Sequence, residues 1–376
     1  MSEKKRAFVL GSYTKSLINF RKQLIVDLQQ RGYEVTAMAP DHDEDTESQL
    51  AALNVNFQLL PLARTGLNVI NDFRTILFLK RLFKKEQPDV LIAYTIKPVI
   101  YANLVLPATV KSIALITGLG YLETGTLTVK KRILRKLILL LYRFSLRHLT
   151  YCVFQNPDDL SFFNQHKLTG RTTKSTITPG SGVDLSYYAR AKPRTDPVRF
   201  LLVARLIRAK GINHFFDAAE KLKSRYNTAV EFQLIGMLDR DNPDAIDESR
   251  LRELSLSGVI IYLGEQRDVR KSLGECSVFV LPTFYREGVP RTILEALAMG
   301  KPVITTDSPG CRETVDQNKN GFLIPTHSSE ALITAMEKFI QDRTLIAQMG
   351  AESYQLAVKR YDVHSVNRQL LDFTNV

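Results

Sequence analysis

The chain alternates short apolar runs with longer stretches in which apolar side chains recur every three or four residues. Residues 6–10 predict a strand, residues 16–31 an amphipathic helix that ends at Gly32, and residues 34–39 a second strand. The same pattern predicts further strands at residues 89–94, 113–116, 151–155, 198–204, 230–235, 259–263, 278–281 and 303–306. Because unalternating apolar runs are typical of strands buried on both faces, we expect an α/β protein with parallel, doubly wound sheets.

The pattern weakens near the middle of the chain. Residues 179–182 read Pro-Gly-Ser-Gly, and residues 193–197 combine two prolines with charged side chains. Such stretches interrupt regular structure. We therefore expect two lobes, residues 1–180 and residues 181–360, and the length of 376 residues is enough for two separate cores.

Two glutamates separated by seven residues stand out in the second lobe. Glu287 falls in a turn after the strand predicted at residues 278–281, and Glu295 lies about two turns along the helix that follows. Gly288 and Pro290 indicate the turn, since proline is accommodated in the first turn of a helix. A helix N-terminus favours anions. The segment suits a sugar diphosphate, although two solvated surface glutamates at this spacing are the simpler alternative.

Two cations follow the first strand of the second lobe. Arg205 and Lys210 lie in the turn after residues 198–204. Ligands of such sheets bind at the carboxyl ends of the strands. Two cations there can hold a diphosphate and stabilise the charge that develops as it leaves. A solvated surface role is the alternative, and it is the preferred interpretation of the neighbouring Arg208.

The glutamate segment, continued by Gly310-Cys-Arg-Glu313 and by residues 320–325, resembles the signature of the retaining GT-B glycosyltransferases of family 4. That signature contains an E-x7-E motif, and the family pattern Arg-x4-Lys matches Arg205 and Lys210. The resemblance runs over nearly the whole chain and is strongest over residues 198–326.

The resemblance implies the GT-B architecture, in which two Rossmann-like lobes enclose an interdomain cleft. Residues 1–180 would bind the acceptor and residues 181–360 the nucleotide sugar. A last helix, residues 361–376, would return to the first lobe.

The family also implies roles for individual residues. Glu295 would bind the ribose hydroxyls of the nucleotide. Glu287 would position the transferred sugar and stabilise charge, next to the amides of Gly288 and Val289. With Arg205 and Lys210 on the diphosphate, the implied catalytic residues are Glu287, Arg205 and Lys210.

Two further positions complete the expected donor site. Arg267 ends the segment Gly264-Glu-Gln-Arg267, which matches the place where the family holds the base. Gly11 follows the first strand, and a residue without a side chain lets the backbone approach a ligand closely. Alternatively, Gly11 simply ends the strand.

Lys97 is the candidate acceptor residue of the first lobe. It follows the strand predicted at residues 89–94, and the segment resembles the branch of the family that builds capsule, O-antigen or other oligosaccharides on polyprenyl diphosphate. Lys97 then either meets the acceptor phosphate or is a surface lysine at the start of a helix.

Residues 129–149 predict a long basic helix. Four cations share a stripe of roughly 60° on it and are called the basic stripe: Arg132, Lys136, Arg143 and Arg147. Apolar surface is expected beside it from Leu134, Leu137, Ile138 and Leu141. Such a helix can lie on an anionic membrane or present cations to a lipid diphosphate. Alternatively, it packs on the protein with its basic side in water.

Composition and the remaining motifs narrow the chemistry. A net charge of +12 favours anionic partners. The 3 cysteines are expected to be buried free thiols, and neither a signal peptide nor a membrane-spanning segment is expected. Asp239-Arg-Asp241 lies in a polar loop that we expect to be remote from the diphosphate residues, and the 6 histidines lack metal spacing. We therefore expect no metal and no cofactor.

Together these features predict a hexosyl- or N-acetylhexosaminyltransferase, cytoplasmic and peripheral at the inner face of the membrane. Its donor would be a UDP-sugar, with an N-acetylhexosamine as one candidate, and its acceptor a polyprenyl-diphosphate-linked saccharide. An epimerase of the same fold is one alternative, but it would need additional acid/base groups. A nucleic-acid-binding protein is another, but the basic residues concentrate in a helix rich in leucine, and no nucleic-acid partner is expected.

Overall fold

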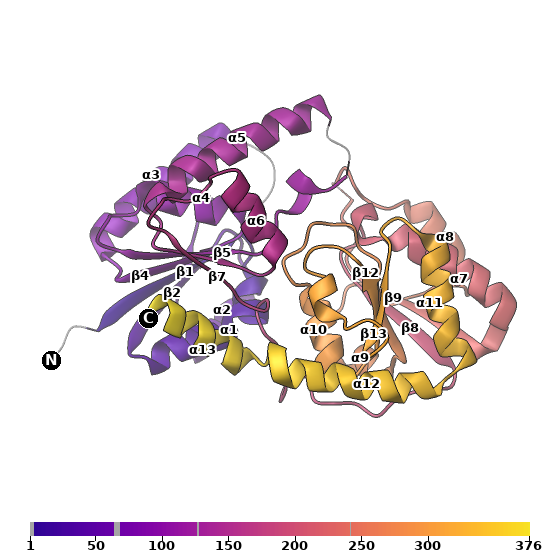
Figure 1. Cartoon of the computed structure of the whole chain (residues 1–376). Coiled ribbons are helices and arrows are strands. Elements are labelled where there is room, and N and C mark those ends of the chain that lie inside the picture. Colours follow the sequence, from indigo (N-terminus) through magenta and orange to yellow (C-terminus); the bar gives the residue numbers. More distant parts are fainter. Residues whose placement is uncertain (1–3, 64–67, 126–127, 241) are drawn as a thin grey trace. The chain divides into compact units, whose positions relative to one another are not determined.

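The computed structural model describes residues 4–63, 68–125, 128–240 and 242–376. The chain forms two compact units, which Figure 1 shows. The first unit runs to Ser181, apart from residues 123–125, and resumes at His364. The second unit comprises Gly182–Val363 together with residues 123–125.

The first unit is built on a parallel sheet of 7 strands in the order β3-β2-β1-β4-β5-β6-β7. The strands are β1 (Lys5–Leu10), β2 (Tyr33–Ala39), β3 (Asn56–Leu59), β4 (Val90–Tyr94), β5 (Lys111–Ile116), β6 (Tyr151–Phe154) and β7 (Lys174–Ile177). The helices are α1 (Lys15–Gln30), α2 (Glu44–Ala52), α3 (Val69–Glu86), α4 (Ile96–Val105), α5 (Val129–Ser145), α6 (Pro157–Gln165) and α13 (Val363–Thr374).

Both faces of this sheet are covered, as the continuous apolar runs predicted. Successive side chains of a strand point to opposite faces. Phe8 and Leu10 therefore enter the core beneath α3, α4 and α5, whereas Ala7 and Val9 enter the core shared with α1, α2 and α13. Figure 1 shows these two helical layers on the first unit.

The second unit has a parallel sheet of 6 strands in the order β10-β9-β8-β11-β12-β13. The strands are β8 (Val198–Val203), β9 (Val230–Ile235), β10 (Ile261–Tyr262), β11 (Val278–Leu281), β12 (Val303–Thr306) and β13 (Gly321–Ile324). The helices are α7 (Ile212–Tyr226), α8 (Glu248–Leu256), α9 (Arg270–Glu275), α10 (Arg291–Ala298), α11 (Ser329–Gln341) and α12 (Thr344–Leu356).

The doubly wound α/β architecture is confirmed, with local differences. The sequence pattern missed β3, β7 and β13, which are all edge strands. The basic helix is shorter than predicted, because a 3-10 turn at Leu146–His148 follows Ser145. The last helix begins at Val363 rather than at residue 361, because a π-helical turn at Ala357–Tyr361 precedes it. The 3 cysteines are free and buried, as predicted.

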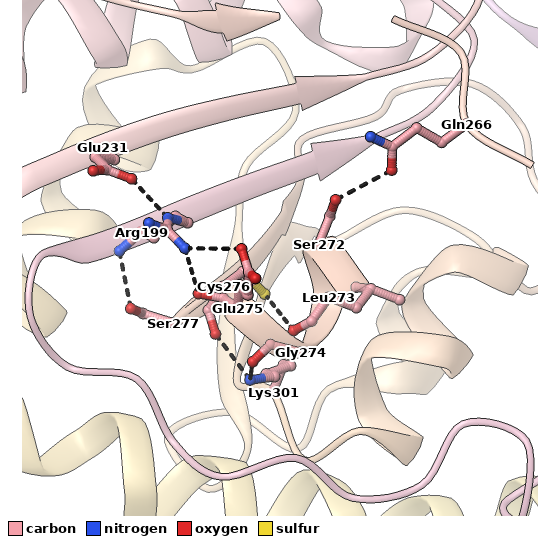
Figure 2. Close-up of polar contacts among 10 residues, drawn as sticks. All are labelled: Arg199, Glu231, Gln266, Ser272, Leu273, Gly274, Glu275, Cys276, Ser277 and Lys301. Carbon is pink, nitrogen blue, oxygen red and sulfur yellow. Dashed lines mark hydrogen bonds and ion pairs between the residues drawn. The ribbon is translucent and has the colours of Figure 1, made fainter. Parts of the chain in front are cut away.

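A buried lysine anchors α9 in the second unit, as Figure 2 shows. Lys301 is 1% exposed, and its Nζ donates to the carbonyls of Gly274 and Cys276, each at 2.9 Å. Burial lowers the pKa of Lys301. Ser272 on the same helix donates to Gln266 Oε1 at 3.1 Å. The loop in which the base site is expected is thus bonded to a firmly held helix.

Candidate active site

Two turns at the carboxyl ends of β8 and β11 are joined through one carbonyl oxygen. These strands are parallel neighbours, so their carboxyl ends meet at one edge of the sheet. The carbonyl of Ala209 accepts hydrogen bonds from Thr283 Oγ1 at 3.1 Å, the Phe284 amide at 2.9 Å and the Tyr285 amide at 3.0 Å. The turn with Lys210 therefore lies beside the turn with Glu287.

Lys210 and Glu287 form an ion pair across these two turns. Lys210 Nζ donates to Glu287 Oε1, and the two side chains are 14% and 15% exposed. Nζ also lies 5.3 Å from the centroid of the Tyr285 ring. The sequence identified both charges as site residues without predicting that they pair. Removing either partner would leave the other charge largely buried and uncompensated.

The turn after β11 rests on Gly310. A Cβ atom at Gly310 would lie 1.5 Å from the carbonyl oxygen of Gly288, and Gly310 has a φ of +83°. Gly288 and Val289 are buried, and they precede the N-terminus of α10 as predicted. The backbone of Gly310 thus supports the position of Glu287.

Glu295 lies in a hydrogen-bonded and nearly buried position on α10. The helix begins at Arg291, so Glu295 is a little over one turn along it, not two as predicted. Its side chain accepts hydrogen bonds from the Tyr188 hydroxyl at 2.9 Å and from Arg291 Nε at 3.1 Å. Burial raises the pKa of the Glu295 carboxyl, while Arg291 and Tyr188 lower it. Arg291 was detectable as a partner from its i−4 spacing, whereas Tyr188 lies far away in sequence.

Arg205 is paired with an aspartate that we expected to be remote. Arg205 Nη1 lies 3.5 Å from Asp239 Oδ2, and the Arg205 side chain is 38% exposed. The expectation was wrong because β9 neighbours β8, and the chain beyond each strand continues this pairing at Leu206 and Leu238. Asp241, the other acid of the motif, lies outside the described residues.

Two other arginines of the second unit lie at the surface. Arg208 is 54% exposed and pairs with Asp244 at 3.3 Å, in keeping with its predicted surface role. Arg267 is also exposed, in the loop between β10 and α9. Within the described ranges, no group of 3 or more His, Cys, Asp and Glu side chains could hold a metal ion.

The structure gives Gly11 in the first unit a packing role that the sequence did not predict. A Cβ atom there would lie 2.3 Å from the Tyr94 hydroxyl, so a protein side chain occupies the space that the glycine leaves. The Tyr94 hydroxyl is hydrogen-bonded to Ser16 Oγ at 2.8 Å, and burial raises the pKa of Tyr94 to about 12. Gly11 therefore accommodates this neighbouring ring, and the close approach of its backbone to a ligand stays a prediction.

Lys97 is not the surface lysine of the second interpretation, and its contact with the acceptor phosphate stays a prediction. Its Nζ donates to Asp72 Oδ1 and to the carbonyl of Ala63, each at 3.0 Å, and its side chain is 14% exposed. Lys97 is therefore neither an exposed surface lysine nor a cation without a partner. The ion pair with Asp72 joins α3 to the start of α4.

All four cations of the basic stripe are exposed on α5 and the turn that follows it. The predicted apolar surface was partly wrong, because Leu134, Ile138 and Leu141 are only partly exposed and the last two pack against the core. The exposed apolar side chains are Val129, Ile133, Leu137, Leu140 and Phe144. No helix in the described part of the chain is both long and apolar enough to cross a bilayer.

Comparison with protein families identifies the class of the molecule. Residues 13–156 match the model of the family described as glycosyl transferase 4-like, and residues 188–356 match that of glycosyl transferases group 1. The chain is therefore a GT-B glycosyltransferase, with a 4-like first part and a group 1 second part.

Curated relatives extend over most of the chain. It is 26% identical over 375 residues to an N,N'-diacetylbacillosaminyl-diphospho-undecaprenol alpha-1,3-N-acetylgalactosaminyltransferase of Campylobacter jejuni, covering 95% of this chain and 94% of that protein. It is 24% identical to a UDP-Gal:alpha-D-GlcNAc-diphosphoundecaprenol alpha-1,3-galactosyltransferase of Escherichia coli, covering 76% and 75%. Among solved structures, HepE of Anabaena in complex with UDP and glucose has a TM-score of 0.75 at 17% identity, covering 98% of both chains.

Proposed function

We propose that this glycosyltransferase moves a sugar from a UDP-sugar to a hydroxyl of a polyprenyl-diphosphate-linked saccharide, with retention at the anomeric carbon. The observation that carries the proposal is the convergence of Arg205, Lys210 and Glu287 at the carboxyl ends of β8 and β11. The undecaprenyl-diphosphate acceptors in the names of two relatives support the acceptor class.

In the proposed reaction, Arg205 and Lys210 bind the diphosphate and stabilise the charge that it gains. The bond between the anomeric carbon and the diphosphate oxygen breaks, and the acceptor oxygen bonds to the same face of that carbon. The acceptor proton passes to the released diphosphate. Cations already held at this position stabilise the departing charge without reorganising during the reaction. Lys210 would share its charge between the diphosphate and Glu287, which positions the sugar.

The other donor contacts follow from the same arrangement. Glu295 accepts hydrogen bonds from the ribose hydroxyls, and the amides of Gly288 and Val289 face the sugar or its phosphate. The loop with Arg267 holds the base. The proposal includes neither a metal nor a cofactor.

A donor screen tests the function directly. UDP-sugars and GDP-mannose are offered with a short lipid-linked acceptor, and the product is identified by its mass. We expect one UDP-sugar to add a single sugar to the acceptor. Conversion of a nucleotide sugar into its epimer without extension of the acceptor would instead identify an epimerase.

Membrane binding is part of the proposal, because a polyprenyl acceptor resides in a bilayer. The basic stripe can contact anionic headgroups while apolar side chains of α5 enter the region between them. Val129 and Ile133 are 71% and 63% exposed, and Phe144 is 53% exposed. We place the enzyme at the cytoplasmic face of the membrane and expect no nucleic-acid partner.

A further inference from the structure

We propose that Tyr188 is a positioning residue for the nucleotide, which holds one oxygen of Glu295 so that the other accepts hydrogen bonds from the ribose hydroxyls. The inference rests on the proposed ribose role of Glu295. It adds a residue from the segment before β8 to a site otherwise formed by the strand-to-helix turns.

Both hydrogen bonds to Glu295 end on the same oxygen. The Tyr188 hydroxyl lies 2.9 Å from Oε1, and Arg291 Nε lies 3.1 Å from that atom. Two donors from different segments of the chain fix the orientation of the carboxylate more strictly than one. Because the carboxylate is planar, fixing Oε1 also limits where Oε2 can point.

The second oxygen is left to accept from elsewhere. Glu295 is 7% exposed, yet within the described ranges Oε2 accepts no hydrogen bond. Oε2 is not fully shielded from solvent, so water can reach it. A largely buried carboxylate oxygen without a protein donor is stabilised when a ligand hydroxyl donates a hydrogen bond to it in place of water. The two neighbouring hydroxyls of a ribose are donors of the right kind.

The donors themselves are firmly placed. Arg291 Nη1 donates to the carbonyl of Gly182, and its guanidinium lies 5.9 Å from the centroid of the Tyr188 ring. Burial raises the pKa of Tyr188 well above its ordinary value, so the hydroxyl keeps its proton near neutral pH. Tyr188 therefore remains a hydrogen-bond donor under the conditions in which the enzyme works.

The test combines two variants with two nucleotides. Tyr188→Phe removes the hydroxyl and keeps the ring. Tyr187→Phe is the matched control on the neighbouring residue. Tyr187 is 48% exposed, and its ring centroid lies 3.8 Å from the guanidinium carbon of Arg270. Calorimetry measures the Kd of UDP and of 2′,3′-dideoxy-UDP for each protein. Thermal unfolding verifies that the variants are folded.

We expect Tyr188→Phe to weaken UDP binding about tenfold, as loss of a hydrogen bond to a charged group does. It should leave dideoxy-UDP binding unchanged, because that ligand lacks the hydroxyls that Oε2 would accept. Tyr187→Phe should bind both nucleotides as the wild type does. If Tyr188 had only a structural role, Tyr188→Phe would weaken the binding of both nucleotides equally, and the inference would be overturned.

Glu295→Gln separates this inference from the ribose role on which it rests. One outcome is that Glu295→Gln weakens the binding of UDP but not of dideoxy-UDP, while Tyr188→Phe binds both nucleotides as the wild type does. This outcome refutes only the positioning role of Tyr188. If the wild type binds UDP and dideoxy-UDP equally, the ribose role of Glu295 is wrong, and the role of Tyr188 is wrong with it.

Discussion

Replacing Gly310 by alanine tests whether the backbone that supports Glu287 determines catalysis. The added methyl carbon would lie 1.5 Å from the carbonyl oxygen of Gly288, whereas real Cβ contacts essentially never fall below 3.0 Å. The oxygen and the methyl carbon must therefore move apart by at least a further 1.5 Å, from 1.5 Å to 3.0 Å. Because the contact is with backbone, no side-chain rotation relieves it.

The expected effect has a stability part and a catalytic part. An alanine at a φ of +83° costs roughly 1–2 kcal/mol, and insertion into a packed position costs about 1–3 kcal/mol more. The unfolding free energy should therefore fall by about 2–5 kcal/mol. A displacement of about 1 Å at a catalytic group can cost about 10²-fold in rate, so turnover of Gly310→Ala should fall by about that factor.

Gly258→Ala is the matched control in the same unit. Gly258 has a φ of +70°, but a Cβ atom there meets nothing within 4 Å. The unfolding free energy of Gly258→Ala should fall only by the roughly 1–2 kcal/mol that alanine costs at a positive φ. Its turnover should stay close to that of the wild type. Turnover is measured with the UDP-sugar and a lipid-linked acceptor at a temperature at which each variant is folded. Equal turnover of the two variants would show that the Gly310 contact does not position Glu287.

Four further outcomes are expected. Arg205→Ala or Lys210→Ala should each cut turnover by about 10²-fold, and near wild-type rates in both would exclude the diphosphate clamp. Excess EDTA should leave activity intact; a loss that Mg²⁺ or Mn²⁺ restores would implicate Asp239 and Asp241. Changing the basic stripe to glutamine should remove up to about 4 kcal/mol of attraction to anionic vesicles in a sedimentation assay, and unchanged binding would mean that α5 is only structural. Burial lowers the pKa of His214 below its ordinary value of 6.5, so the unfolded chain binds more protons than the folded protein near that pH. The wild type should therefore lose stability relative to His214→Asn as the pH falls through 6.5 and below. A stability difference between the two proteins that does not change with pH would contradict this.

The central strands were readable from the sequence because their environment is uniform. Val230–Ile235, Val278–Leu281 and Val303–Thr306 coincide with the predictions, since both faces of each strand are covered and most of their positions hold buried apolar residues. Edge strands lack this uniformity. In β7, Lys174–Ile177, the first two residues are exposed and the last two only partly buried, so no continuous apolar run marks it.

Strand and turn signals are local, so they were enough to predict which charges lie at the carboxyl ends of strands. Arg205, Lys210 and Glu287 were placed correctly in their turns. Their ion-pair partners follow instead from the order of the strands. The sheet order sets β8 beside β11, which pairs Lys210 with Glu287, and it sets β9 on the other side of β8, which brings Asp239 to Arg205.

The same holds for the contacts of Lys97 and Gly11 that the sequence did not predict. Lys97 meets Asp72 because α3 packs against α4, and Tyr94 fills the space at Gly11 because β4 lies next to β1. Each contact joins segments separated by many residues, whereas periodicity reports only how each segment is buried. A residue pattern therefore fixes the type and the place of a charge along its own element. The long-range pairing of strands and helices decides whether that charge meets an ion-pair partner, a buried hydroxyl or water.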